Sequence, residues 1–186
     1  MTTDKSKFGY WLWLTKWGRF DEELDFSALS RCKRVGKRET PDTLNGITFG
    51  QLWQLQELKD MGKMLVEVPK IVLGMTDEEL AEAPTTEVVR FVAWVARELK
   101  RINELFEKIN RKPKSEEVRA GIHKLNHGMF GMADWYAKRM GIKDHEEVMS
   151  VGWIRIYQCM KKDNEVAEFE ERLQKVYEND RKMRRK

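Results

Sequence analysis

Two histidines four positions apart, His123 and His127, are the residues whose types and spacing point most directly to chemistry. On a helix this spacing puts both imidazoles on one face, where they could hold a divalent metal. His145 or Asp134 could approach as a third ligand, although the sequence places neither of them. The glutamate that follows the first histidine of a metalloprotease helix is missing. We therefore interpret the histidines as surface or structural residues and predict neither a metal nor a cofactor.

Adjacent glutamates recur along the chain, and each pair falls at an expected helix start or on a charged face. The helix dipole or simple solvation explains such pairs without acid–base chemistry. The pairs are Glu78 and Glu79, Glu116 and Glu117, Glu146 and Glu147, and Glu170 and Glu171. The sequence also has no glycine-rich phosphate loop, no nucleophile elbow and no nucleophile with an evident base. We predict that the chain is not an enzyme and has no catalytic residues.

The most unusual feature is a cluster of aromatic residues near the N-terminus. Large flat side chains supply contact area at low entropic cost. The cluster is therefore either the lid of this chain's own core or an anchor on a neighbouring protein, and the sequence leaves both open. Phe49 and Trp53 would receive or extend the contact. The candidate partner-binding residues are Phe8, Tyr10, Trp11, Trp13, Trp17, Phe20, Phe49 and Trp53.

Composition indicates a folded chain with charged helix faces. Of 186 residues, 41% are hydrophobic and 35% are charged, and the net charge is only +4. This length suits one domain with arms. Cys32 and Cys159 lie far apart and form no metal or disulfide motif, which fits a reducing compartment. We find no signal peptide and no apolar run long enough to span a membrane.

Breaker residues and helix caps predict three regions: an aromatic and basic arm with an extended linker over 1–46, a helical domain over 47–180, and a basic tail over 181–186. Capping boxes at Thr48 and Thr76 start two helices, the first of which we expect to end near Gly62. The apolar run 64–73 could be a buried helix or a strand, and we favour a helix.

The second half of the chain continues the helical pattern. Apolar residues from Val88 to Ile109 alternate in steps of four and three, which predicts a long core helix. We expect further helices over 129–140, from Asp144 through Tyr157, and from Asn164 onward. The predicted fold is an all-α multi-helix bundle with a long central helix and an N-terminal aromatic arm.

Two features support an alternative function, that of a nucleic-acid-binding accessory protein. Residues 133–157 resemble a helix-turn-helix corner, but the second helix opens with Asp144, His145, Glu146 and Glu147, whose carboxylates would face phosphates. The tail could bind nucleic acid through charge alone. Its basic residues are Arg181, Lys182, Arg184, Arg185 and Lys186.

Two stretches are similar to known proteins. The segment 46–52, with its TFGQ run, resembles the openings of small helical proteins in tailed-bacteriophage structural modules. Residues 130–142 and the helix after them look like the C-terminal helices of phage tail-assembly-chaperone-like proteins. The resemblance spans roughly residues 46–177 and leaves the arm outside.

The resemblance implies a non-enzymatic structural or assembly protein of a bacteriophage virion: a connector, a capsid-associated protein or a tail-assembly component, assembled in the host cytoplasm. Its expected partners are other phage structural proteins and copies of itself in an oligomer. Neighbouring copies could exchange their aromatic arms around a ring.

Overall fold

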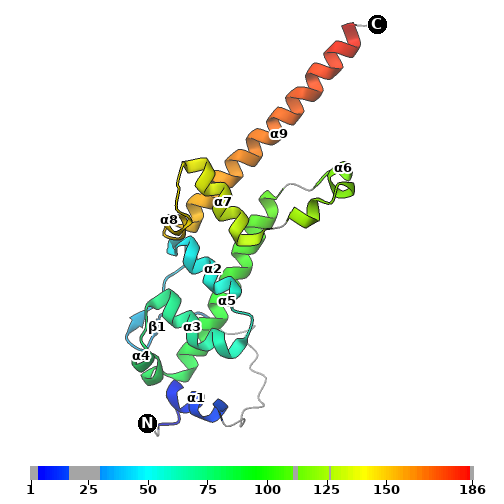
Figure 1. Ribbon diagram of the computed structural model, residues 1–186. Coiled ribbons are helices and arrows are strands. Elements are labelled where there is room, and N and C mark those ends of the chain that lie inside the picture. Colours follow the sequence, from blue (N-terminus) through cyan, green and yellow to red (C-terminus); the bar gives the residue numbers. More distant parts are fainter. Residues whose placement is uncertain (1–3, 17–29, 111–112, 126, 185–186) are drawn as a thin grey trace. The chain divides into compact units, whose positions relative to one another are not determined.

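The chain forms an all-α fold in a computed structural model that describes residues 4–16, 30–110, 113–125 and 127–184 (Figure 1). It divides into two compact units, Met1–Ile102 and Asn103–Lys186. This division falls within the long helix, whereas the sequence suggested a boundary at residue 46. Among the described residues, no helix is both long enough and apolar enough to cross a membrane.

The first unit consists of short helices, one hairpin and most of the long helix. Its elements are α1 (Phe8–Lys16), β1 (Arg34–Val35), β2 (Arg38–Glu39), the 3-10 helix η1 (Leu44–Gly46), α2 (Phe49–Glu57), α3 (Met61–Leu73), α4 (Asp77–Glu82) and α5 (Thr85–Ile109), which continues into the second unit. The two strands pair antiparallel, with Arg34 opposite Glu39.

Both predicted capping boxes are confirmed. The Thr48 hydroxyl accepts from the backbone of Gln51 at 3.1 Å, and the Gln51 side chain accepts from the backbone of Thr48 at 2.9 Å. Thr76 and Glu79 make the same reciprocal pair at the start of α4. These bonds satisfy amide groups that a helix leaves without intrahelical partners at its N-terminus.

The apolar run 64–73 is helical, as favoured from the sequence, and lies in α3 with Pro69 inside the helix. The helix before it ends at Glu57 and not near Gly62. The reason is local: Asp60 caps α3, and its carboxylate accepts from the backbone of Lys63 at 2.8 Å. An N-cap residue has an extended backbone, so the preceding helix cannot run through it.

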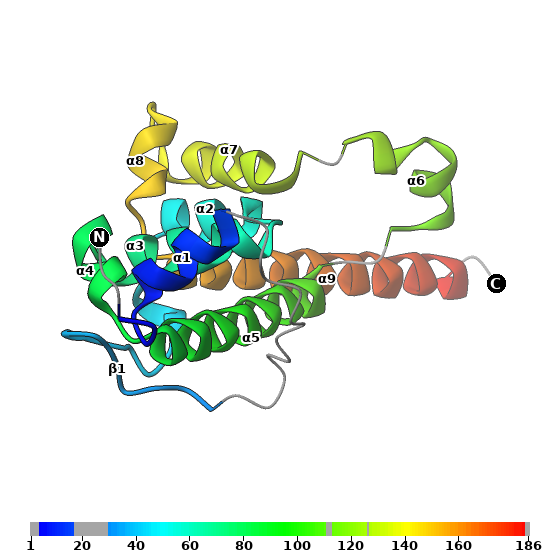
Figure 2. The ribbon, with the colours of Figure 1, turned by 90° about the horizontal axis from the view of Figure 1, so that it is seen from below.

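The segment 30–46, which the sequence suggested to be an extended linker, packs along α5 instead. Val35 and Leu44 are fully buried. Glu87 of α5 accepts a hydrogen bond from the backbone of Gly36 at 2.8 Å, and Glu98 accepts one from the backbone of Leu44 at 3.1 Å. Figure 2 shows the segment that carries β1 beside α5.

The second unit holds the end of α5 and the remaining helices: α6 (Ser115–Arg119), the 3-10 helix η2 (Ile122–Leu125), α7 (Gly128–Met140), α8 (His145–Met149) and α9 (Trp153–Arg184). Phe106 of α5 contacts Trp153 and Tyr157 of α9, with ring centroids 6.1 and 5.4 Å apart. Tyr136, Val148 and Ile156 are also buried. These residues form the core of the second unit.

Two helix boundaries in this unit were predicted wrongly. The helix expected from Asp144 through Tyr157 is two helices, since α8 ends at Met149 and α9 begins at Trp153. The helix expected to begin at Asn164 begins eleven positions earlier. Asn164 lies inside α9, where its side-chain amide donates to the carbonyl of Ile109 at 2.6 Å. That bond caps a free carbonyl at the end of α5, so the asparagine serves a contact between helices and does not start one.

Candidate docking surface

Phe8 of the aromatic cluster lies in the core of the first unit. Phe8 is 0% exposed, and its backbone amide donates to the carbonyl of Ala83 at 2.9 Å. Trp11 stacks on Phe8, with ring centroids 5.3 Å apart, and both Trp11 and Tyr10 are half-buried. For Phe8, the lid interpretation therefore describes the structure better than a free anchor does.

The remaining predicted partner-binding residues are buried, half-buried or undescribed. Phe49 is fully buried, so its ring presents no surface to a partner. Trp53 packs edge-on against Phe49 and donates to Glu57 at 2.7 Å. The side chain of Trp13 and all of Trp17 and Phe20 lie outside the described residues.

The possible metal pair is described only in part. The side chain of His123 lies outside the description, and no group of three possible metal ligands occurs among the described residues. His145 and Asp134, the two candidate third ligands, do approach one another at 3.4 Å. Lys138 binds the same carboxylate at 2.6 Å and, together with His145, lowers the pKa of Asp134. The contact between Asp134 and His145 links α7 to α8.

The elements of the alternative, nucleic-acid-binding function are the helix-turn-helix corner and the basic tail, and the corner lacks a helix long enough to read DNA bases. The second helix of the predicted corner, α8, has only five residues. A helix of that length is shorter than two turns and cannot lie along a major groove as a recognition helix does. Arg181, Lys182 and Arg184 are exposed in the last turns of α9, whereas Arg185 and Lys186 lie outside the described residues.

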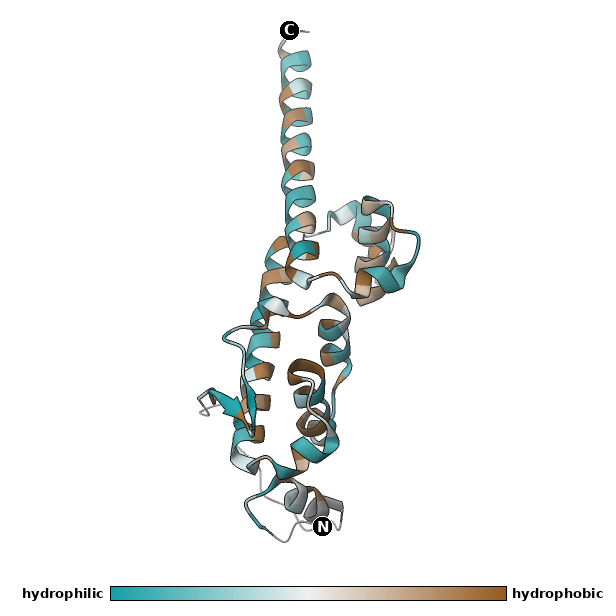
Figure 3. Cartoon of the chain, turned by 90° about the vertical axis from the view of Figure 1, so that its left-hand side faces the viewer, coloured by the Kyte–Doolittle hydropathy of each residue, from teal (hydrophilic) through white to brown (hydrophobic). Residues whose placement is uncertain are grey.

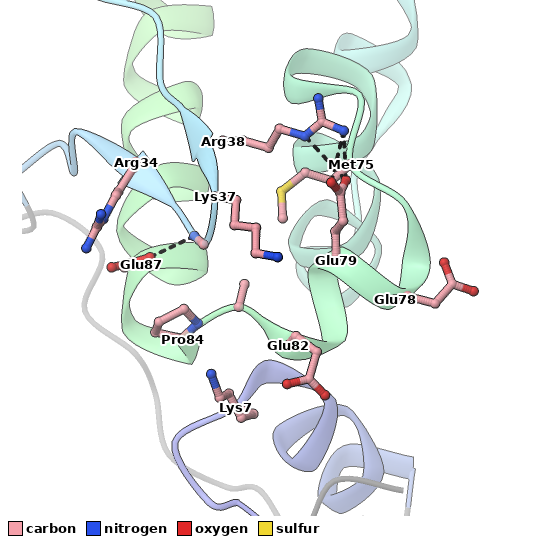
Figure 4. Close-up of a pocket in the computed structure, with 12 residues that line it drawn as sticks. Lys7, Arg34, Lys37, Arg38, Met75, Glu78, Glu79, Glu82, Pro84 and Glu87 are labelled. Carbon is pink, nitrogen blue, oxygen red and sulfur yellow. Dashed lines mark hydrogen bonds and ion pairs between the residues drawn. The ribbon is translucent and has the colours of Figure 1, made fainter.

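The first unit has a cavity of about 560 Å³ between the hairpin, α4 and the start of α5 (Figure 4). Its charged lining is balanced. Arg38 and Glu79 pair at 3.0 Å, which holds the pKa of Glu79 below its usual value, and Glu87 is engaged by Gly36. The charged residues of the lining are Lys7, Arg34, Lys37, Arg38, Glu78, Glu79, Glu82 and Glu87. With four cations and four anions, the cavity favours no ionic ligand by its sign.

A different surface, on α9, exposes apolar side chains in a regular series. Phe169 is 56% exposed, and Val166, Val176, Tyr177 and Met183 are exposed as well. Leu173 lies between them and is half-buried. Figure 3 shows apolar bands recurring along this helix. We call Val166, Phe169, Leu173, Val176, Tyr177 and Met183 the α9 stripe.

The spacing of the α9 stripe is that of a coiled-coil seam. Val166, Phe169, Leu173 and Val176 follow one another by three, four and three positions, and Met183 continues the series one heptad after Val176. Such a series keeps apolar residues on one face of a helix over several turns, where a second helix can cover them. Large contiguous apolar patches on protein surfaces are typical of interaction sites.

The charged side chains of the same helix stabilise it in isolation. Arg172 pairs with Glu168 at 3.6 Å, and Lys175 pairs with Glu171 at 3.1 Å, both one helical turn apart. Lys175 and Lys114 together lower the pKa of Glu171. Each such pair stabilises an exposed helix by about 0.2–0.5 kcal/mol. These pairs add to the helical stability of α9 and leave the apolar side chains of the stripe exposed.

The sequence predicted part of this surface. Val166, Phe169, Leu173 and Val176 repeat the apolar step of the long core helix, so their spacing alone does not separate them from core residues. Tyr177 and Met183 were missed as members. The signal that separates them from core is the density of charges on all other faces of the helix after Lys161.

Comparisons with known proteins found no relative with which the α9 stripe could be compared. The chain matches no protein-family model, no curated protein and no solved structure.

Proposed function

We propose that the chain is a non-enzymatic assembly protein that acts by docking to other proteins through the α9 stripe. The main support for this proposal is that Phe169 and its apolar neighbours are exposed on a helix whose other faces are charged. Burying such a stripe in an interface gains roughly 25 cal/mol for each Å² of apolar surface removed from water. This gain is the physical reason for a partner.

The setting that we propose is the assembly of a tailed-bacteriophage particle, as a connector, capsid-associated or tail-assembly component. The support is the resemblance of residues 46–52 and 130–142 to small helical phage proteins, together with the docking surface on α9. The docking role moves from the aromatic segment to α9, because Phe8 and Phe49 are buried within the first unit.

A photo-crosslinking amino acid at position 169 tests this function in the cells from which the chain derives. Glu178 offers a matched control, because nine positions at about 100° each place it on the opposite side of the helix. We expect position 169 to yield adducts identified by mass spectrometry as another copy of the chain or a structural protein of a phage particle. Adducts with nucleic acid, or equal adducts from positions 169 and 178, would overturn the proposal.

A further inference from the structure

The charges of α9 are segregated along its length. Residues 165–171 contain four glutamates and no lysine or arginine, and residues 181–186 contain five basic residues and no acidic one. Between them, residues 172–180 carry two basic and two acidic residues, Arg172, Lys175, Glu178 and Asp180. The α9 stripe therefore runs from an acidic end to a basic end.

From this polarity we infer that the occupant of the α9 stripe is a second copy of α9, paired antiparallel. The inference rests on the proposed docking function and names its partner. In an antiparallel pair the acidic end of each copy, residues 165–168, lies beside the basic end of the other, residues 181–184, which is favourable at both ends of the seam. A parallel pair would place four glutamates beside four glutamates and five basic residues beside five.

The apolar positions are also self-complementary in this arrangement. In an antiparallel pair, residue numbers rise along one copy as they fall along the other. If Leu173 of one copy lies opposite Val176 of the other, then Val166, seven positions before Leu173, lies opposite Met183, seven positions after Val176. An isologous two-fold interface requires this property, because each residue must meet the same partner in both directions. The pairing extends over residues 165–184, a helix length of about 30 Å.

One position in the seam is polar. Asp180 occupies the heptad position between Val176 and Met183, and in this register it lies opposite Phe169 of the other copy. A single polar residue in a coiled-coil seam lowers stability but helps to specify one register. We therefore expect Asp180 to favour this one register and to weaken the association of the two copies.

Disulfide trapping tests both the partner and its direction. Two full-length chains carry Val166→Cys or Met183→Cys, both at exposed positions, in a Cys159→Ala background; Cys32 is buried. A disulfide requires α-carbons within about 7 Å. In the antiparallel pair, position 166 lies beside position 183 of the other copy, and the two copies of position 166 lie about 26 Å apart.

We expect a mixture of the two chains to give a covalent heterodimer on mild oxidation, with little homodimer from either chain alone. Efficient homodimers of the Val166→Cys chain would show a parallel pair and would overturn the inference. No cross-link in any combination, with a monomeric mass by light scattering and native helicity by circular dichroism, would overturn the second copy as occupant. The photo-crosslink at position 169 reports on the docking function separately, because it captures any partner.

Discussion

Glu87 on α5 accepts a hydrogen bond from the backbone amide of Gly36, 2.8 Å away, and so holds the tip of the β1–β2 hairpin against the long helix. Gly36 has a φ of 58°, a left-handed conformation that glycine adopts without strain. Cys32 donates to the carbonyl of the same glutamate at 3.4 Å. A segment rich in glycine and charge is thereby built into the first unit.

Replacing Glu87 with alanine should free the hairpin from α5. The change leaves the Gly36 amide without its charged acceptor, and we expect a loss of about 1–2 kcal/mol in the free energy of unfolding of the first unit. Amide hydrogen exchange at Gly36 should accelerate. Glu82→Ala, at an exposed carboxylate that lines the same cavity, is the matched control and should change neither quantity. Equal effects from the two variants would mean that the hairpin contact contributes nothing.

Phe8→Ala should destabilise the first unit strongly. The ring is fully buried, and large-to-small changes of this kind cost about 3–5 kcal/mol. The measurement is chemical unfolding followed by circular dichroism. Phe130→Ala removes the same ring from a site that is 54% exposed and serves as the control. A small loss in the free energy of unfolding for Phe8→Ala, similar to that for Phe130→Ala, would indicate that the aromatic segment is a free arm and not part of the core.

Stability should depend on acid through Glu98. Its side chain is 14% exposed, and its pKa is lowered mainly by the hydrogen bond from Arg101 and further by the backbone amide of Leu44. Because the folded state holds this pKa below 4.5, the stabilisation is fully present above that value and is lost as the pH falls through the lowered one.

Glu98→Gln should therefore cost about 1–2 kcal/mol at neutral pH and nothing at a pH where Glu98 is protonated in both states. Urea unfolding at several pH values measures the difference. Glu104→Gln, at an exposed position further along α5, is the control. A deficit in Glu98→Gln that stays constant down to the most acidic pH would refute the assignment to ionised Glu98.

Asp180→Leu should tighten the pairing of α9. The substitution replaces the charged position of the seam with an apolar residue opposite Phe169 of the other copy, so more apolar surface is buried and no carboxylate is desolvated. Sedimentation equilibrium should show a lower dissociation constant than for the unaltered chain. Glu178→Leu, on the opposite side of the helix, should leave the dissociation constant unchanged. An equal decrease of the dissociation constant in both variants would indicate nonspecific association.

Helices and their caps were predictable because their signals are local. Thr48 with Gln51 and Thr76 with Glu79 act within a few residues of sequence, and each pair forms the predicted capping box. The helix predicted over 129–140 ends at Met140 as expected, before Gly141 in a left-handed conformation. The helix period from Val88 to Ile109 is likewise carried by consecutive turns of α5.

The remaining differences come from contacts between distant residues. Asn164 resembles a helix start, but it caps α5 through the carbonyl of Ile109, 55 positions away. The 30–46 segment resembles a linker because its stabilising partners, such as Glu87 and Glu98, lie on another element. The α9 stripe resembles core in its spacing, and only its exposure in the folded chain distinguishes it as a surface.

The most direct test of whether two copies associate through α9 is their mass by light scattering over a range of concentration. The three chains compared are the unaltered chain, Phe169→Glu and Phe130→Glu. The two phenylalanines are 56% and 54% exposed, and only Phe169 lies in the stripe. We predict that the unaltered chain and Phe130→Glu approach twice the 22.1 kDa of one chain, and that Phe169→Glu remains at 22.1 kDa with unchanged helicity. A mass of 22.1 kDa for all three chains, or equal dimerisation by all three, would contradict the pairing.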